Sequence, residues 1–305
     1  DDPAAYLEGN SPYLGVVVGR VSGRIAGGTF ELDGERFEVP RNNGEACLHG
    51  GARGFDRHVW AVAEQGQGPA GGQSVTLEHT SPDGDQGFPG EVRARVTYTV
   101  PKNLARLVVK FEATTTKPCP VSLAHHTYFN LAGHDSGDVL QQEMCIYSDA
   151  YTPADKGLVP TGQVLPVGGT HLDFRQAKPL GQGIDEMTDA GGFDHNFVLH
   201  EEGHSDFIQR PGLGRGMRLA ADACDPASGR AFQLFSDAPG MVMYTGNFLD
   251  GSVVGKGGAA YQKRSGFCLE TQHHPNAVNV PAFPSPVLQP GDTYSHTMVY
   301  DFYVR

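Results

Sequence analysis

The sequence is poor in the features that mark membrane proteins and nucleic-acid-binding proteins. No apolar run approaches the ~18 residues of a membrane-spanning helix, and the chain opens on Asp-Asp-Pro rather than on a charged, then apolar, signal peptide. Positive charge is also scarce, because 23 Lys and Arg residues stand against 35 Asp and Glu residues, for a formal net charge of −12. A nucleic acid or an anionic membrane surface would require clustered positive charge. We therefore expect no nucleic-acid partner and no membrane partner, but a neutral or cationic small ligand.

Cysteine is sparse as well, and its spacing excludes two common uses. The five cysteines are odd in number and never form a CxxC pair, so they suggest neither a disulfide framework nor a thiolate zinc site. The GxxxxGK[ST] order of a phosphate-binding loop is also missing. We expect no cofactor and no metal. A reducing compartment follows, and the expected location is cytoplasmic, unless a segment upstream of Asp1 carries a targeting signal.

The sequence does contain a strong β-strand signal. Its 41 glycines and 21 prolines suit many turns and few long helices, and no convincing amphipathic helix separates the strand-like segments. Asp33-Gly34 joins two short strands within residues 29–39, which is the pattern of a hairpin turn. We predict an all-β protein, a large antiparallel β-sandwich, that forms a single domain over residues 1–305. Further strands are expected at residues 74–79, 91–100, 105–116, 143–148, 193–199, 230–236, 241–244, 266–272 and 294–303.

Residues 120–131 are predicted to form a strand with two unlike faces, because successive side chains of a strand point to opposite sides. One face is mainly apolar and the other carries hydrogen-bonding groups, which suits a sheet whose back packs a core and whose front meets a polar ligand. His126 on the polar face is the first candidate functional residue. The apolar face holds Val121, Leu123, His125, Thr127, Phe129 and Leu131, and the polar face holds Ser122, His126, Tyr128 and Asn130.

Two further strands repeat this division. Asp194 and Asn196 lie opposite the apolar positions of residues 193–199, and Glu270 lies opposite Phe267 and Leu269 in residues 266–272. A carboxylate inside such a strand must be solvated, paired or part of a site, because burying it alone costs several kcal/mol. If the polar faces meet, a carboxylate and an imidazole frame a cleft, and this pair is the minimum for general acid and general base catalysis.

Each of these candidates also has a structural interpretation. His126 could be a core histidine with satisfied hydrogen bonds, Asp194 a turn-supporting residue and Glu270 half of a surface ion pair. His273 and His274 next to Glu270 raise a metal site as an alternative, since imidazole and carboxylate are common ligands. Adjacent histidines on a strand point in opposite directions, however, so both cannot readily bind one ion.

Two segments nearer the N-terminus add candidate binding residues. Residues 42–56 form a glycine-rich loop that exposes His49 where the backbone can approach a ligand closely; a plain surface turn is the alternative. Arg20 and Arg24 lie near the end of a predicted strand, where either could bind a ligand.

A set of motifs along nearly the whole chain resembles the aldose 1-epimerase family, also called the galactose mutarotases. The motifs occur in the family's order, and their joint occurrence is far more specific than any one of them. They are NSPYLG (10–15), GRVSGRI (19–25), LHGGARGFD (48–56), SPDGDQGFPG (81–90), HTYFNLAG (126–133), GFDHNF (192–197), YTGNFL (244–249) and LETQH (269–273).

The resemblance implies a β-sandwich of the galactose mutarotase type, whose N-terminal strands we expect to be lacking from this chain. It implies that the enzyme interconverts the α and β anomers of a free aldohexose, a monosaccharide such as glucose or galactose, as a monomer or homodimer. By resemblance, Glu270 is the general base at the C1 hydroxyl and His126 is the general acid at the ring oxygen. His49, Arg24 and Asp194 match positions that hold sugar hydroxyls or the ring oxygen.

The sequence departs from the family pattern at a few positions. Gly23 stands where many relatives have an asparagine, and Val242 stands where some relatives have a ligand-binding glutamine. Each substitution removes a side-chain amide. His125 replaces the usual asparagine before the catalytic histidine, and His274 falls where an aromatic residue is common. Two rival functions remain. One is a non-catalytic sugar-binding protein on the same fold. The other is a hexose-6-phosphate 1-epimerase, which should have a cluster of basic residues around its pocket, whereas only Arg24 and Arg53 lie near the motifs.

Overall fold

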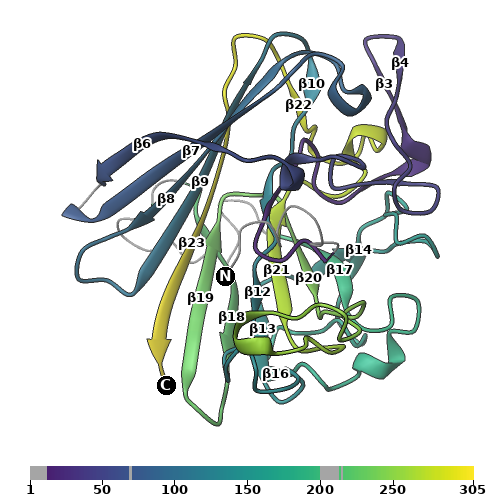
Figure 1. The fold of residues 1–305 in the computed structure, drawn as a ribbon. Helices are drawn as coiled ribbons and strands as arrows, with labels where there is room; N and C mark the ends of the chain where they lie inside the picture. Colours follow the sequence, from purple (N-terminus) through teal and green to yellow (C-terminus); the bar gives the residue numbers. More distant parts are fainter. Residues whose placement is uncertain (1–11, 69–70, 200–212, 214–215) are drawn as a thin grey trace.

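The structure, a computed structural model, describes residues 12–68, 71–199, 213 and 216–305. Two large sheets dominate it, and every pair of named strands in these residues is antiparallel (Figure 1). The prediction of an all-β antiparallel sandwich is thereby confirmed.

The first sheet has nine strands and runs along the left of Figure 1. In spatial order its strands are β16 (Lys178–Pro179), β13 (Glu143–Ile146), β18 (Arg218–Cys224), β19 (Arg230–Ser236), β23 (Tyr294–Val304), β9 (Arg106–Thr115), β8 (Val92–Val100), β7 (Gln73–Ser81) and β6 (Ala61–Gln67).

The second sheet has six strands, and its outer face carries the candidate site. Its spatial order is β12 (Tyr128–Phe129), β21 (Phe267–Gln272), β20 (Gly240–Tyr244), β17 (Asp194–Val198), β14 (Ala150–Thr152) and β15 (Leu165–Pro166). Four two-stranded pieces complete the described strands: β1 (Val17–Val18) with β11 (Ala124–His125), β10 (Cys119–Pro120) with β22 (Val287–Leu288), β2 (Arg24–Ile25) with β5 (Cys47–Leu48), and β3 (Thr29–Leu32) with β4 (Glu35–Glu38).

The helices that the structure describes are all single turns of 3-10 helix. They lie in the loops between strands and do not form a layer. They are η1 (Ala26–Gly28), η2 (Phe55–Arg57), η4 (Asp85–Gly87), η5 (Ile184–Glu186), η6 (Lys256–Gly258) and η7 (Ala277–Asn279). None of the described helices is long and apolar enough to cross a membrane.

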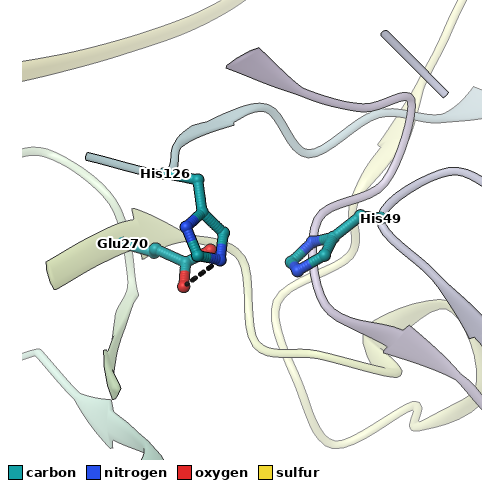
Figure 2. Close-up of side chains that lie close together, drawn as sticks. All are labelled: His49, His126 and Glu270. Atoms are coloured by element: carbon teal, nitrogen blue, oxygen red, sulfur yellow. Dashed lines mark ion pairs between the residues drawn. The ribbon is translucent and has the colours of Figure 1, made fainter. Parts of the chain in front are cut away.

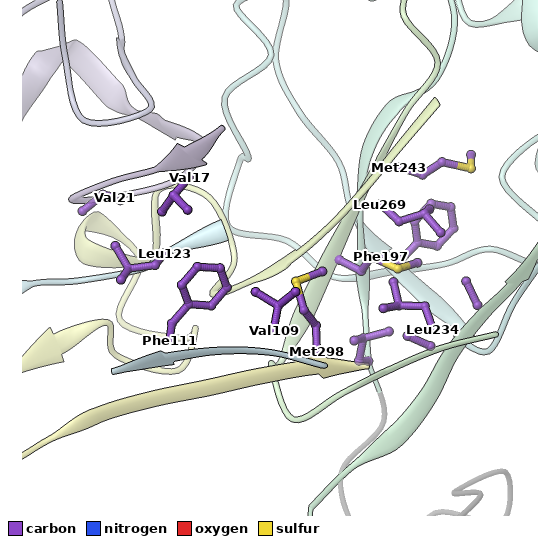
Figure 3. Packing of buried hydrophobic residues seen from close by; sticks show 14 of the residues in the cluster. Val17, Val21, Val109, Phe111, Leu123, Phe197, Leu234, Met243, Leu269 and Met298 are labelled. Atoms are coloured by element: carbon purple, nitrogen blue, oxygen red, sulfur yellow. The ribbon is translucent and has the colours of Figure 1, made fainter. Parts of the chain in front are cut away.

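One hydrophobic core joins the two sheets. Val109 and Met298 from the nine-stranded sheet lie toward Phe197 and Leu269 from the six-stranded sheet (Figure 3). Leu269 lies in this core while its neighbour Glu270 lines the cavity on the outer face, as the two-residue period requires. The expectation of a single domain over residues 1–305 stays a prediction.

Most of the predicted strands are present, including the hairpin, whose turn residues Asp33 and Gly34 both have positive φ (52° and 79°). Two long strands, β18 and β6, were not predicted, for opposite reasons. Nearly every residue of β18 is buried, so it shows no alternation. Every residue of β6 is exposed, so it shows no apolar face.

The prediction of one strand over residues 120–131 is wrong. The segment contains the last residue of β10 and the whole of β11 and β12, and these two-residue strands belong to three different sheets. The backbone changes partner along its length: the Val121 amide donates to the Pro286 carbonyl, that of Ser122 to Arg20, and that of His126 to Val16. The segment therefore bends from one sheet to the next and cannot run straight, although Val121 and Leu123 are buried as expected.

Candidate active site

The outer face of the six-stranded sheet is the floor of a cavity of about 940 Å³, a size typical of small-molecule sites. Strand register places Asn196, Val242 and Glu270 side by side in one row across β17, β20 and β21. Asp194 lies in the row on one side, and Gln272 in the row on the other, because residues two apart share a face. Residues from 12–13, 23–27, 42–57 and 152–160 form the walls.

His126 and Glu270 form a buried pair on this floor. The Nε2 atom of His126 lies 3.5 Å from Oε1 of Glu270, and the two side chains are only 6% and 4% exposed (Figure 2). Burial, with a contribution from Asp194, raises the pKa of Glu270 to about 8. Burial also lowers the pKa of His126 to about 4. Near neutral pH and without a ligand, the pair therefore holds one proton, which lies on Glu270.

The second ring nitrogen of His126 also has a buried partner. Its Nδ1 lies 3.5 Å from Sγ of Cys268, which occupies the same face of β21 two residues before Glu270. Burial raises the pKa of the Cys268 thiol far above its usual range, and Glu270 adds to the effect. Cys268 thus stays a neutral thiol. The aromatic rings of Tyr13, Tyr128 and Tyr244 lie around His126.

His49 faces His126 from the glycine-rich loop, with ring centroids 5.4 Å apart (Figure 2). The backbone amide of Gly23 donates to His49 Nδ1 at 3.2 Å. Burial, with His126 and Arg24 nearby, lowers the pKa of His49 well below its usual value. A neutral imidazole that accepts at Nδ1 carries its proton on Nε2, so His49 can donate one hydrogen bond to a ligand. The loop must pass close to the chain here, since a Cβ at Gly50 would lie 1.9 Å from the Gly19 carbonyl oxygen.

Arg24 and Asp194 meet on the same side of the cavity. Arg24 Nη1 lies 3.6 Å from Asp194 Oδ2, and Arg24 Nε donates to Asn43 Oδ1 at 3.0 Å. Burial raises the pKa of Asp194, and Arg24 opposes the shift. The five residues predicted from the sequence, Glu270, His126, His49, Arg24 and Asp194, thus all line one cavity; their individual roles stay predictions.

One group of three metal-ligand residues exists in the part of the chain that the structure describes. His49, His126 and Glu270 each offer a ligand atom, and these atoms lie within 4.8 Å of one another. An ion held there would occupy the same nitrogen and oxygen atoms that acid–base chemistry needs. The alternative based on His273 and His274 is not favoured, since neither lines the cavity beside Glu270 and His274 Nδ1 contacts the Asn196 amide at 3.0 Å.

The structure explains the glycine at position 23 and shows what His125 and His274 contact, but it gives no explanation for the valine at position 242. Gly23 has φ +77°, and a Cβ there would lie 2.8 Å from the Pro275 ring. Val242 puts an apolar side chain in the middle of the floor. His125 is on the apolar side, where its Nε2 lies 3.0 Å from the Tyr98 hydroxyl, and the His274 ring packs against Phe283.

Several lining residues were not among the sequence-predicted site residues. Gln272 and Asn196 share a face with Glu270 and Asp194. The two-residue period puts both on the polar faces, but it does not show which polar residues of a face reach a ligand. Tyr13 lies in the first quoted motif, of which residues 10 and 11 are outside the described residues, and no periodicity marks it. Phe248, which is also at the cavity, follows β20 in a loop.

Comparisons with known proteins agree with these features. A family model described as aldose 1-epimerase matches residues 1–301. The galactose mutarotase of Sus scrofa is 44% identical over 299 residues, covering 98% of this chain and 81% of the relative. The galactose mutarotase of Rattus norvegicus is 43% identical over 303 residues, covering 98% and 82%. The crystal structure of an aldose epimerase homologue from C. elegans superposes with a TM-score of 0.84 at 28% identity, covering 100% of this chain and 86% of that one.

Proposed function

The chain belongs to the aldose 1-epimerase family, and from that premise we propose that it interconverts the α and β anomers of free aldohexoses such as glucose and galactose. The observation that carries this proposal is the buried His126–Glu270 pair, with Nε2 and Oε1 3.5 Å apart on the cavity floor. The enzyme is an isomerase, and its ligand is a monosaccharide.

In the proposed reaction, Glu270 accepts the proton of the C1 hydroxyl while His126 donates a proton to the ring oxygen O5. The C1–O5 bond breaks, and C1 becomes the aldehyde carbon of the open-chain sugar. Rotation about C1–C2 presents the other face of the aldehyde to the O5 hydroxyl. On reclosure, O5 returns its proton to His126 and Glu270 returns its proton to the C1 oxygen. The two side chains end as they began, so no outside proton donor is required.

The state of the pair before the reaction sets one requirement. Burial places the shared proton on Glu270, whose pKa is about 8, whereas the proposed roles need it on His126. The proton therefore has to move between Oε1 and Nε2 when the sugar binds. Sugar hydroxyls that donate to the Glu270 carboxylate favour this transfer, because hydrogen bonds to the charged form lower a pKa. Arg24 acts in the same direction.

The neighbouring residues are suited to hold the sugar. His49 has a free Nε2–H to donate toward the ring oxygen or a hydroxyl, as its Nδ1 accepts from Gly23. Arg24 is fixed by Asp194 and Asn43, and these charged groups can bind hydroxyls as donor and acceptor. We assign binding roles to His49, Arg24 and Asp194, and catalytic roles only to Glu270 and His126.

Polarimetry on freshly dissolved α-glucose or α-galactose tests the proposal. We expect the approach to the equilibrium rotation to be faster than the spontaneous rate and proportional to enzyme concentration. A non-catalytic sugar-binding protein would leave the spontaneous rate unchanged. Glucose 6-phosphate as substrate tests the hexose-6-phosphate alternative, for which the cavity offers Arg24, Arg57 and Lys156. Arg24 and Arg57 are already paired with Asp194 and Asp56, so we expect a free hexose to be preferred.

The cysteines bear on the location of the protein. All five cysteines are free and four of them are buried, and free buried cysteines are typical of a reducing compartment. We propose a cytoplasmic protein that works as a monomer or homodimer. Size-exclusion chromatography coupled to light scattering would determine the number of subunits.

A further inference from the structure

Two buried amide side chains at the cavity each have one atom without a hydrogen-bond partner. Gln272 and Asn196 are 1% and 4% exposed, and both line the cavity. Among the described residues, neither Gln272 Nε2 nor Asn196 Oδ1 has a partner. Buried polar atoms are normally paired, because leaving one unpaired is unfavourable. Unpaired atoms in a cavity wall therefore point to a ligand that pairs with them.

Gln272 is held in place by one end of its amide. The Ser22 hydroxyl donates to Gln272 Oε1, and the other end lies next to Gly23, where a Cβ would be 3.4 Å from Nε2. Because residue 23 has no side chain, nothing from that position covers the amide nitrogen. A single bond to Ser22 uses one end of the amide, so the opposite end is left for a ligand whichever way the amide is turned.

Asn196 is similarly half satisfied. Its Nδ2 lies 3.1 Å from Thr152 Oγ1 and 3.0 Å from His274 Nδ1, which accounts for both amide protons. Burial lowers the pKa of His274 to about 4, so its ring is neutral and Nδ1 can accept. The carbonyl Oδ1 remains, next to Gly240, where a Cβ would lie 2.8 Å away. Val242, the neighbour of Asn196 in the row, is apolar and offers no partner.

We propose that Gln272 and Asn196 are specificity-determining residues that bind hydroxyl groups of the aldose on carbons other than C1. The proposal rests on the proposed function, which places C1 and O5 at Glu270 and His126. Gln272 is two residues beyond Glu270 on the same face of β21, a distance of about 7 Å along a strand. It therefore meets a part of the sugar remote from the reacting bond. A hydroxyl both donates and accepts, so it pairs with either end of an amide.

The two amides also define the substrate class. They are neutral, so they recognise free hydroxyls and give no charge to attract a phosphate. A site that hydrogen-bonds a substrate hydroxyl rejects analogues that lack it, because its own buried polar groups are then unpaired. We expect a free hexose to be preferred over the deoxy sugar that lacks the bound hydroxyl.

Single-hydroxyl analogues combined with variants test this inference. The measured quantity is kcat/KM by polarimetry for glucose and for its 2-, 3-, 4- and 6-deoxy analogues. With the wild-type enzyme, we expect at least one remote deoxy analogue to lose about 10- to 100-fold, the range for an unpaired buried polar group. In Gln272→Met, which lacks the amide but has similar length, glucose itself should lose a comparable factor, and the penalty for that analogue should disappear. Asn196→Ala should abolish the penalty for the hydroxyl that binds Asn196.

A control separates recognition from general damage. Gln142 is also a buried glutamine (2% exposed), but it does not line the cavity. Both ends of its amide are paired, because Oε1 accepts from the Leu131 amide and Nε2 donates to Asn130 Oδ1. Gln142→Met should leave every deoxy penalty as in the wild type. If Gln272→Met fails to fold, Ser22→Ala is used instead. This variant keeps Gln272 but removes the hydrogen bond from the Ser22 hydroxyl, so the penalty for the same deoxy analogue should become smaller.

The outcomes are distinct. If wild-type enzyme accelerates mutarotation but each deoxy penalty is unchanged in the folded variants at positions 22, 196 and 272, the inference is overturned and the proposed function stands. If the wild type gives no acceleration, the proposed function fails. In that case the dissociation constants of glucose and its deoxy analogues are measured for the same variants by titration calorimetry. Loss of the deoxy penalty in the variants supports the inference, and its persistence overturns it.

Discussion

His126 and Glu270 face each other across 3.5 Å, from Nε2 to Oε1, on the cavity floor, where both side chains are almost fully buried. Burial shifts their pKa values in opposite directions, to about 4 for the imidazole and about 8 for the carboxyl. Between these values the pair holds one proton. Mutarotation requires a pair that holds one proton, because one group must donate a proton while the other accepts one.

The first prediction concerns Glu270→Gln. Glutamine has nearly the same shape but cannot accept the C1 hydroxyl proton, so we expect kcat to fall by about 10²–10⁴, the usual contribution of a general base. Polarimetry on α-galactose measures the loss, and circular dichroism checks that the β-sheet signal is retained. Near-normal turnover by this variant would remove Glu270 from the proposed mechanism.

The same variant should change the pH dependence of stability. The pKa of Glu270 is raised from 4.5 to about 8, so between these values the folded protein binds more protons at this site than the unfolded chain. The free energy of unfolding then falls as pH rises. Glutamine does not titrate, so the stability of the variant relative to wild type should increase from about pH 5 to about pH 8. Urea unfolding at both pH values measures it, and a constant difference would contradict the raised pKa.

A second prediction is the pH profile of kcat/KM. Activity should be greatest where the His126–Glu270 pair holds one proton, and it should fall below about pH 4 and above about pH 8. These limits belong to the pair and not to either residue alone. Asp194, whose pKa burial raises, and His49, whose pKa burial lowers, are neighbouring titratable groups in the same cavity. An enzymatic rate that still rises above pH 9, after correction for base catalysis by the buffer, would contradict the proposed pair.

The sequence was sufficient to find five residues that line the cavity, but not the shape of the cavity. The two-residue period put Asp194 and Glu270 on faces opposite their apolar neighbours, and both lie on the cavity floor. Whether such faces meet depends on strand order, here β21 next to β20 next to β17, and no local pattern contains that order. The contact between Cys268 and His126 likewise joins distant segments and has no signal in either one.

The failures have local physical causes. Residues 120–131 alternate as a strand should, yet they bend between sheets because their backbone partners change at almost every step. Alternation reports which side of the chain is apolar, not whether the chain is straight. For Gln272, the period gave the right face, but only the structure shows that one end of its amide is unpaired.

A third prediction concerns Cys268, whose Sγ lies 3.5 Å from His126 Nδ1. Cys268→Ala leaves this ring nitrogen without its partner, so the imidazole is less firmly oriented. We expect kcat to fall by about tenfold, in keeping with the loss of one buried hydrogen bond, with little change in KM, since Cys268 is not a cavity-lining residue. Cys268→Ser should retain most activity. The 15N shifts of His126 should change in the alanine variant, and kcat equal to wild type with unchanged shifts would exclude this positioning role.

The fourth prediction uses Gly23, which has φ +77° and lies under Pro275. Gly23→Ala places a Cβ in the left-handed region, and that Cβ would lie 2.8 Å from the Pro275 Cβ. Both effects destabilise the folded state, and we expect the free energy of unfolding to fall by about 1–3 kcal/mol. Urea unfolding monitored by fluorescence provides the measurement.

Gly34 is the matched control for this substitution. It has nearly the same φ, +79°, but nothing lies within 4 Å of where its Cβ would be. Gly34→Ala therefore carries the cost of the backbone conformation alone, and the difference between the two variants is the cost of the contact with Pro275. Gly23→Ala/Pro275→Ala keeps the Cβ of residue 275 but removes the Cγ that would lie 2.9 Å from the new Cβ, so it should recover part of that difference. If both variants lose the same free energy of unfolding, Pro275 moves away from the new Cβ without an energetic cost. Residue 23 would then be a glycine only because of its backbone angle.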